Sequence, residues 1–373
     1  MKFLRRLTLL VSKQYAAIGG QAVIEGVMMR SPNAFVVAVR TPDGQIRLRR
    51  DQWFGLGKKF AFLRKPVLRG VLMLVETMAN GIVSLNYSAN VSMDAELKAK
   101  ALAKGKTEAQ YESEKKKAEK VDIATFLTML LSLGFGIGLF VFVPHALTAW
   151  IGQASGQDWG LDSFAFHAVD GVIKATIFVL YIWLIGFMPD VRRVFQFHGA
   201  EHKSISTFEA GLPLTVENAR KFTTIHPRCG TSFLFFLILI SIILFSAVFT
   251  LVPVGAGLPP VLRHVVAALF KVVLMFPVAG ISYEVIKVAG KCSTAWWARA
   301  MSAPGMLLQK LTTREPADDQ LEVALVSIKA VLFLEDKFDL KAQDKKILSL
   351  EEVDIKGLGD IAETNAGLKD FLE

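Results

Sequence analysis

Cysteine is scarce in this chain, and several common binding signatures are missing from it. Its 373 residues include only two cysteines, Cys229 and Cys292, so the disulfide framework of a small secreted domain is not expected. The sequence contains neither a Walker-type loop nor a G-x-G-x-x-G turn. Its net charge of +9 comes without the interleaved basic and aromatic residues of a nucleic-acid-binding surface, so no nucleic-acid partner is predicted.

Hydrophobic residues make up 52% of the chain and are concentrated in four runs that carry few charges. Each run is long enough to cross about 30 Å of hydrocarbon, and a single segment in lipid must be helical to satisfy its backbone hydrogen bonds. The runs cover residues 123–144, 166–188, 231–254 and 264–289. We therefore predict a mainly α integral membrane protein with four transmembrane helices, a small N-terminal β unit and cytoplasmic amphipathic helices.

The distribution of Lys and Arg predicts the orientation of these helices. Residues 1–70 carry 14 Lys and Arg against three acidic residues, and the connection 189–230 carries six Lys and Arg. The connection 145–165 has none. Because basic loops stay inside, we predict a multi-pass protein of the bacterial inner (plasma) membrane with both termini and residues 189–230 in the cytoplasm. The expected partner is a bilayer with anionic head groups. A protein partner and a homo-oligomer are left open.

The chain divides into five segments by the same patterns. Residues 1–65 form a cytoplasmic segment with a small β unit, whose hairpin turns at Pro42-Asp43-Gly44. The remaining segments are an amphipathic helix with a Lys-rich hinge (66–122), the four-helix transmembrane domain (123–289), C-terminal amphipathic helices (290–334) and a charged, partly disordered tail (335–373).

The helix predicted from Pro66 to Ala89 is apolar enough to raise the question of a fifth span. A crossing there would place the Lys-rich hinge outside and invert every later charge signal. We therefore expect an interfacial or protein-buried helix.

The cytoplasmic loop 189–230 holds three of the six histidines of the chain. His198, Glu201 and His202 form an H-x-x-E-H pattern, the reverse of the zinc-protease H-E-x-x-H order. Four residues apart on a helix, His198 and His202 share one face and can bind one cation, and zinc is the expected metal because it commonly takes imidazole ligands. Glu201 is placed to act as a general base, and Lys203 could stabilise negative charge or reach lipid phosphate.

Two histidines do not complete a catalytic zinc site, which takes three protein ligands and an open position. His226, Cys229, Glu217 and Glu209 are the candidates for the third ligand, and Arg228 for holding an anionic group. Glu217 has a second interpretation, because a carboxylate in the first turn of a helix capped by Thr215 can simply balance the helix dipole. Histidines that face lipid head groups are the alternative for the whole cluster.

Charged residues also occur inside the predicted spans. Asp170, Lys174 and Lys271 are costly in lipid. Asp170 and Lys174 are expected to pair inside the helix bundle, and Lys271 to join them or to snorkel toward the interface. A transport or proton path is the functional alternative to such a structural pair.

With these residues in view, the sequence resembles the YqhQ family of uncharacterised bacterial membrane proteins. The resemblance rests on four blocks, GGQAVIEGVMMRSP (19–32), FHGAEHKSISTFE (197–209), LTVENARKFTTIHPRCGTSFL (214–234) and QKLTTREPADDQLEVALVSIKAVL (309–332). Members are described as predicted metal-dependent enzymes, which implies a site that includes the candidate residues of the loop. Glu25 stands in the first block and could close over the same site.

These observations lead to one functional prediction and two rivals. We expect a cytoplasm-facing membrane metalloprotein that binds a divalent metal, zinc, and acts as a hydrolase at the inner membrane surface. The alternative is a non-catalytic scaffold or docking platform for a protein partner. A transporter ranks third, because four spans with few intramembrane charges make a thin pathway.

Overall fold

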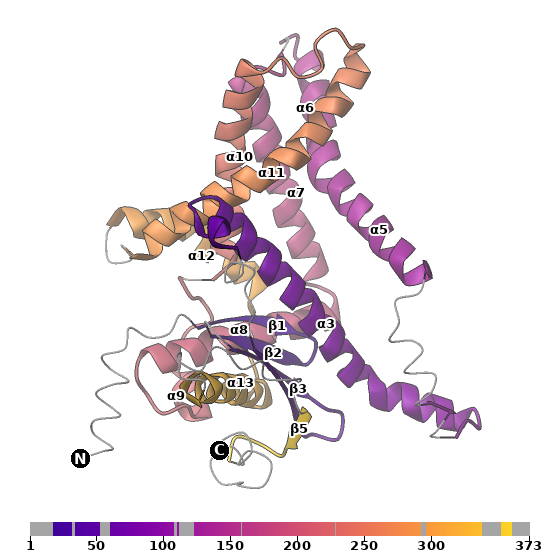
Figure 1. Ribbon diagram of the computed structural model, residues 1–373, viewed down its shortest axis with the longest axis vertical. Coiled ribbons are helices and arrows are strands. Elements are labelled where there is room, and N and C mark those ends of the chain that lie inside the picture. Colours follow the sequence, from indigo (N-terminus) through magenta and orange to yellow (C-terminus); the bar gives the residue numbers. More distant parts are fainter. Residues whose placement is uncertain are drawn as a thin grey trace.

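The structure is a computed structural model that describes most of the chain. The described residues are 18–31, 34–52, 60–107, 110–111, 123–157, 159–227, 229–291, 296–337 and 352–359. An antiparallel sheet with its covering helices lies at one end of the molecule, and a bundle of apolar helices forms the other end (Figure 1).

The sheet has five antiparallel strands in sequence order. They are β1 (Gly19–Val23), β2 (Gly26–Arg30), β3 (Ala34–Arg40), β4 (Ile46–Gln52) and β5 (Glu352–Ile355). The predicted hairpin is confirmed as β3 and β4, which turn through Gly44 at φ +86°. The charged tail supplies β5, paired with β4, so the part of it that the structure describes is an ordered strand.

Helices cover both faces of the sheet. Alternate residues of β2 and β3, such as Met29 and Val36, pack against α8 (Pro189–Glu209) and α13 (Asp318–Lys337). The intervening residues, such as Met28 and Val37, pack against Tyr87 and Val91 of α3 (Leu68–Ala103). Because side chains of a strand alternate between faces, a sheet buried on both sides needs continuous apolar strands such as AFVVAV. Strands and helices from distant parts of the chain therefore build one three-layered unit, with α3 on one face of the sheet and α8 and α13 on the other. We call it the sheet unit.

The helix bundle consists of α7 (Phe164–Ile185), α10 (Thr231–Leu251), α11 (Pro260–Lys291) and a long kinked element. The kinked element joins α5 (Ile123–Ile137), the π turn η2 (Gly138–Phe142) and α6 (Val143–Ala154). We expected the first span to end at Pro144, which was wrong. The π turn frees the carbonyls that a proline ring would meet, so the helix continues to Ala154.

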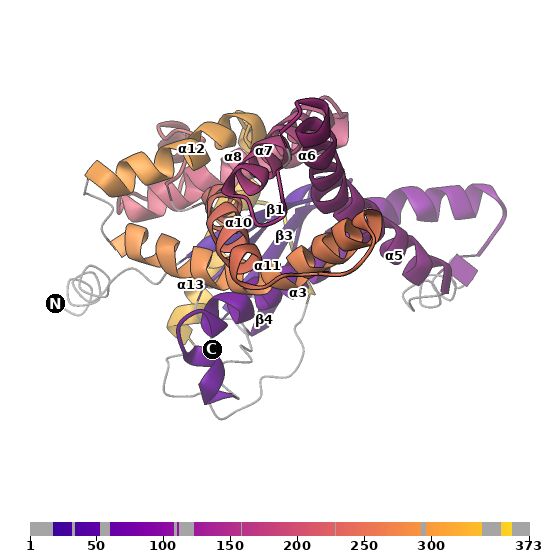
Figure 2. The same ribbon diagram turned by 90° about the horizontal axis from the view of Figure 1, so that it is seen from above.

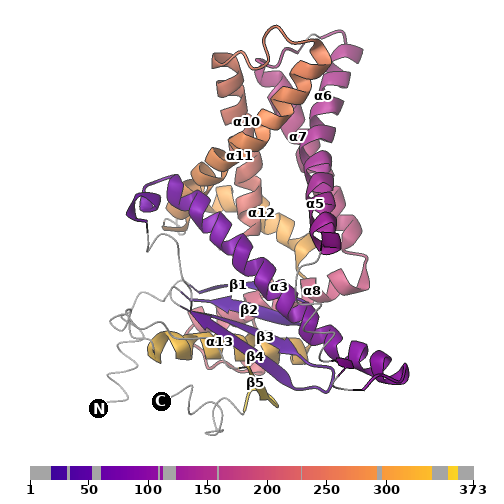
Figure 3. The same cartoon turned by 45° about the vertical axis from the view of Figure 1, so that its right-hand side comes forward.

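Three further elements connect these parts of the chain. The 3-10 helix η1 (Ala61–Arg64) leads into α3, and the short helix α9 (Val216–Arg220) follows α8. Helix α12 (Trp296–Thr312) runs along the base of the bundle toward α13 (Figures 2 and 3). The second C-terminal helix, predicted from Asp318, is confirmed as α13, although it is largely buried rather than amphipathic on the surface.

Five helices are long and apolar enough to cross a membrane, which indicates a multi-pass membrane protein. Four of them correspond to the predicted spans, and the fifth is Leu68–Asp94 within α3. The exact count of four is therefore not confirmed. The helix predicted to end at Ala89 also continues through the first part of the Lys-rich hinge to Ala103.

Candidate metal centre

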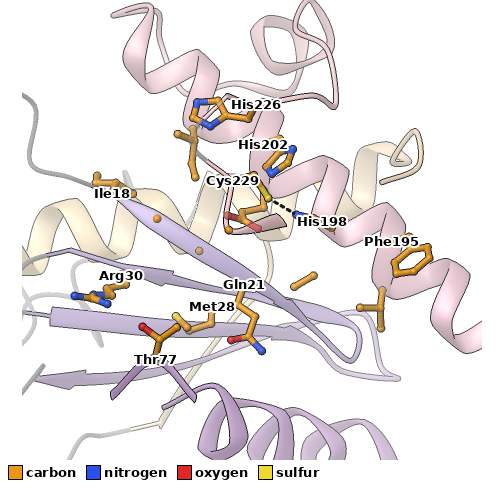
Figure 4. Close-up of a pocket in the computed structure, with 17 residues that line it drawn as sticks. Ile18, Gln21, Met28, Arg30, Thr77, Phe195, His198, His202, His226 and Cys229 are labelled. Atoms are coloured by element: carbon orange, nitrogen blue, oxygen red, sulfur yellow. Dashed lines mark hydrogen bonds between the residues drawn. The ribbon is translucent and has the colours of Figure 1, made fainter. Parts of the chain in front are cut away.

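Helix α8 presents the three residues of the H-x-x-E-H pattern on adjacent turns. The ring centroids of His198 and His202 lie 4.4 Å apart, as expected for residues four apart on one helical face. Cys229 approaches from the segment just before α10, and its Sγ lies 3.3 Å from Nε2 of His198 (Figure 4). One ligand atom from each of the three residues lies within 4.8 Å of the other two.

Backbone carbonyls fix which nitrogen of each imidazole faces the cluster. Nδ1 of His198 donates to the carbonyl of Thr312 at 2.9 Å, and Nδ1 of His202 donates to the carbonyl of Thr224 at 2.5 Å. In a neutral ring the lone pair is therefore on Nε2. Metal-ligating histidines commonly hold their outer nitrogen in this way.

The three donors fit a soft divalent cation. The Nε2 atom of His202 is buried and has no hydrogen-bond partner among the described residues, which is unfavourable unless a ligand satisfies it. Neighbouring donors of a tetrahedral zinc are about 3.3–3.8 Å apart, given bond lengths of about 2.0–2.3 Å. The group must therefore contract by at most about 1 Å to enclose zinc.

Burial sets the protonation states at the centre. Burial, with help from the nearby charge of His198, lowers the pKa of His202 to about 3. The imidazole is thus neutral at pH 7, which is the form that binds a metal. Burial also raises the pKa of Glu201 to about 7, although the backbone N–H of Gly20 donates a hydrogen bond to this carboxylate. Glu201 can therefore both accept and return a proton near neutrality.

The centre opens onto a cavity of about 460 Å³ between the sheet unit and the base of the bundle. Strand β1 forms one wall and α8 the opposite wall (Figure 4), and Thr77 of α3 and Gly230 just before α10 also line the cavity. Apolar side chains such as Met28 and Phe195 dominate the lining. A substrate with an apolar portion would be shielded from water here.

Glycines allow the close approaches on which this geometry depends. A Cβ on Gly20 of β1 would lie 2.8 Å from Cγ of Glu201. A Cβ on Gly199 of α8 would lie 2.1 Å from the carbonyl oxygen of Arg314, in the segment that follows α12. Only glycine fits at both contacts, and the second contact keeps Thr312 within reach of His198.

Of the other candidate third ligands, His226 and Glu209 lie close to the cluster but form their own pair. Nε2 of His226 is 3.3 Å from the Glu209 carboxylate, and the two rings of His202 and His226 are 5.7 Å apart. The backbone of His226 exchanges two 2.8 Å hydrogen bonds with the side-chain amide of Gln309. His226 lines the cavity, so it neighbours the three-ligand group without belonging to it.

Two further candidates, Glu217 and Lys203, lie away from the three-ligand group. Glu217 is exposed in the first turn of α9, where its own backbone N–H and the Thr215 cap lower its pKa, so the dipole interpretation fits it. Lys203 pairs with Glu315 and does not line the cavity. Arg228 lies outside the described residues.

Glu25 does not close over the centre as the sequence suggested. It occupies the turn between β1 and β2 with φ +52° and pairs with Arg193 on α8. The pair joins the sheet to the start of α8, and Glu25 does not line the cavity. Its contribution is to position α8 rather than to bind a ligand.

Sequence reasoning missed the groups that orient the cluster, because they are backbone atoms. The carbonyls of Thr224 and Thr312 and the N–H of Gly20 carry no residue-type signature. The consecutive Gly19 and Gly20 were the one signal that could have indicated them, since paired glycines in an apolar strand are typical of close backbone approach.

Comparison with known proteins places the chain among relatives of undetermined activity. Residues 65–333 match the family model described as "Protein of unknown function (DUF1385)". The chain is 34% identical over 329 residues to the "Uncharacterized protein YqhQ" of Bacillus subtilis (strain 168), covering 86% of this chain and 93% of the relative. No solved structure matches the chain.

Proposed function

The chain belongs to the DUF1385 family, and we propose that it is a membrane metalloprotein whose His198, His202 and Cys229 bind one divalent cation, zinc. The observation that carries the proposal is the convergence of these three donors, one of which, Nε2 of His202, has no hydrogen-bond partner in the part of the chain that the structure describes. Two nitrogens and one sulfur are a donor set that zinc accepts, and it leaves one tetrahedral position open. Solvent-facing histidines would instead have favoured the docking platform.

The open position and the neighbouring carboxylate support hydrolysis as the reaction. A zinc ion held here would act as a Lewis acid toward a carbonyl or phosphoryl oxygen and make water more acidic. Glu201, ionised beside the cation, would take the proton of the attacking water and pass it to the leaving group. The apolar lining of the cavity would hold the substrate and exclude bulk water.

We further propose that the centre faces the cytoplasm at the surface of the bacterial inner membrane. The basic residues of the sheet unit and of 189–230 support this orientation. Four helices would cross, and α3 would lie between bilayer and sheet, because Tyr87 and Val91 are buried against the β strands. Its oblique path along the sheet is consistent with an interfacial position (Figure 3).

The metal content of purified protein tests the proposal. The protein is prepared with a tag that contains no histidine, incubated with zinc, desalted and analysed by mass spectrometry for metal per chain. One equivalent is expected in the wild type and in Glu201→Gln, because a base is not a ligand. His202→Ala and Cys229→Ala should lose it, since each removes a donor.

His226→Gln is the matched control, because it alters a buried histidine next to the cluster and leaves the three donors in place. It should retain about one equivalent. All variants are compared by gel filtration and circular dichroism, so that unfolded protein is recognised. Equal zinc in wild type and a folded His202→Ala variant, or no zinc in the wild type, would contradict the proposal.

A further inference from the structure

A second group of polar residues is buried in the helix bundle, at the end away from the sheet. Lys271 and Asp170 are each 1% exposed, and His145 is 3% exposed. They come from α11, α7 and α6. Ionisable side chains at membrane depth are costly and are rare without a functional reason. This group shares no residue with the candidate metal centre.

The hydrogen bonds of the group have a fixed direction. Nζ of Lys271 donates to Oδ2 of Asp170 at 2.8 Å and lies 3.1 Å from Nδ1 of His145. An ammonium group can only donate, so Nδ1 of His145 accepts and the proton of the neutral ring is on Nε2. That Nε2 lies 3.0 Å from Nδ1 of His264, which must accept in turn. The remaining proton of His264 is then on its own Nε2.

The chain of donors leads to the surface of the molecule. His264 lies in the second turn of α11, next to the loop that joins α10 to α11 at the end of the bundle farthest from the sheet (Figure 1). Its side chain is partly exposed, whereas those of His145 and Lys271 are buried. The π turn η2 directly precedes α6 and sets the position from which His145 projects. Such turns are frequent at functional sites.

We propose that Lys271, His145 and His264 form a proton-transfer chain that connects a buried proton-binding site to the compartment at the sheet-distal end of the bundle. In the release direction, a proton passes from Nζ of Lys271 to Nδ1 of His145. The Nε2 proton of His145 passes to Nδ1 of His264, and the Nε2 proton of His264 passes to water. One proton leaves, Lys271 becomes a neutral amine, and both imidazoles change tautomer while staying neutral. Uptake is the same sequence reversed.

The groups that surround the proton-transfer chain indicate that it opens to one compartment only and does not form a channel through the bundle. Lys174 is 3.5 Å from Oδ2 of Asp170, His167 is bonded to the carbonyl of Leu161, and Arg263 precedes His264. Helix α10 presents Phe245, whose ring faces both lysines at 5.6 Å. Toward the sheet, residues 175–185, 231–251 and 272–283 contain no Asp, Glu, Lys, Arg or His, so no side chain of these types continues the path.

Asp170 has a separate role as the counter-ion. It accepts a hydrogen bond from Lys271 while that side chain is a protonated ammonium. Its Oδ1 is buried without a partner among the described residues. A carboxylate with an unused acceptor can keep its charge while the neighbouring amine loses a proton, provided that Lys174 remains beside it. The Asp170–Lys271 pair can therefore persist whether Lys271 is an ammonium or a neutral amine.

Nitrogen NMR of protein in lipid bilayers, with histidine and lysine labelled with nitrogen-15, tests the proposal. The six histidines and the resonance of one buried lysine can be assigned by single substitutions. As the pH rises, we expect an amine signal from Lys271. His145 and His264 should change from the Nε2–H to the Nδ1–H tautomer with the same midpoint, because the three transfers form one event. A static ion pair would give an ammonium at every pH or imidazoles that change independently, and either result would overturn the chain.

Exchange kinetics provide the second measurement. In His264→Phe the outer end of the chain is removed, so deuterium exchange at the His145 ring nitrogen should slow about tenfold or more. His167→Gln is the matched control, because it changes a neighbouring buried histidine outside the chain and should leave the rate unchanged. Equal slowing in both variants, or no slowing in His264→Phe, would contradict the proposal. If a variant does not fold, the NMR titration of the wild type still tests the proposal.

Discussion

Zinc binding should expel a proton from Glu201, and the amount can be worked out from the structure. Burial raises the pKa of this carboxyl to about 7, so the folded protein holds it protonated at pH 6. A divalent cation beside it favours the ionised form, as any neighbouring positive charge does. The charges of His198 and Cys229 already act on Glu201, which places it within electrostatic reach of the cation.

The magnitude follows from the protonated fraction of one carboxyl. With a pKa of about 7, Glu201 is about 90% protonated at pH 6, about 50% at pH 7 and about 10% at pH 8. Zinc binding to the wild type should therefore release about 0.9, 0.5 and 0.1 more protons than binding to Glu201→Gln at these pH values. The comparison removes the contribution of the Cys229 thiol, because that proton leaves in both proteins. His202 contributes none, since its pKa of about 3 keeps it neutral throughout.

Isothermal titration calorimetry measures the released protons directly. Zinc is titrated into each protein in two buffers that differ in enthalpy of ionisation, and the slope gives the number of protons per zinc. A difference between the two proteins that stays near zero at all three pH values would refute the reasoning about Glu201. A difference that rises with pH would also contradict it, because a carboxyl can only lose more protons when it starts out more protonated.

Two further predictions concern the packing and the topology. Gly199→Ala should lower the free energy of unfolding by about 3 kcal/mol, because its Cβ would meet the carbonyl of Arg314, whereas Gly134→Ala, with no atom within 4 Å, should change it by less than about 1 kcal/mol. Unfolding in increasing denaturing detergent measures both. A cysteine at Asn90 should react in intact cells only with membrane-permeant reagents, and one at Gly257 with impermeant reagents as well, if α3 does not cross. Labelling at Asn90 with protection at Gly257 would instead mean a fifth crossing, because three candidate spans separate the two positions and keep them on opposite sides of the membrane.

The sequence predicted those features that depend on local pattern. The β3–β4 hairpin, the Thr215 cap and the helical face shared by His198 and His202 each follow from a few neighbouring residues, and each is confirmed. The apolar runs likewise predicted the helices of the bundle, because uncharged apolar runs of about 20 residues are typical of membrane-crossing helices. The ends of these helices were harder to predict. A proline inside a helix usually breaks it, and no residue pattern in the sequence indicated the π turn that lets the helix continue past Pro144.

The features that were missed depend on contacts between distant parts of the chain. Strand β5 pairs with β4 across about 300 residues, and a short segment such as EVDI carries too little pattern to be assigned to a sheet. Lys203 looked accessible to a substrate because nothing in the sequence indicated Glu315 as its partner. The choice among candidate third ligands likewise could not be made from the sequence. Cys229 and His226 are three residues apart, and only the fold decides which of them faces His198.

Helix α8 connects the candidate metal centre to both parts of the protein, the sheet unit and the helix bundle. Its Phe197, Ala200 and Ile205 pack on the sheet and α13, while His198 and His202 turn toward the start of α10. A helix with 3.6 residues per turn can present different residues to two sides. The sequence of α8 must therefore fit the sheet and α13 on one side and the start of α10 on the other. A cation bound by α8 and by the segment before α10 would join the sheet unit to the bundle with bonds that neither part makes alone. Binding at the centre would therefore change the contact between the two parts, which is where the cavity and its apolar lining also lie.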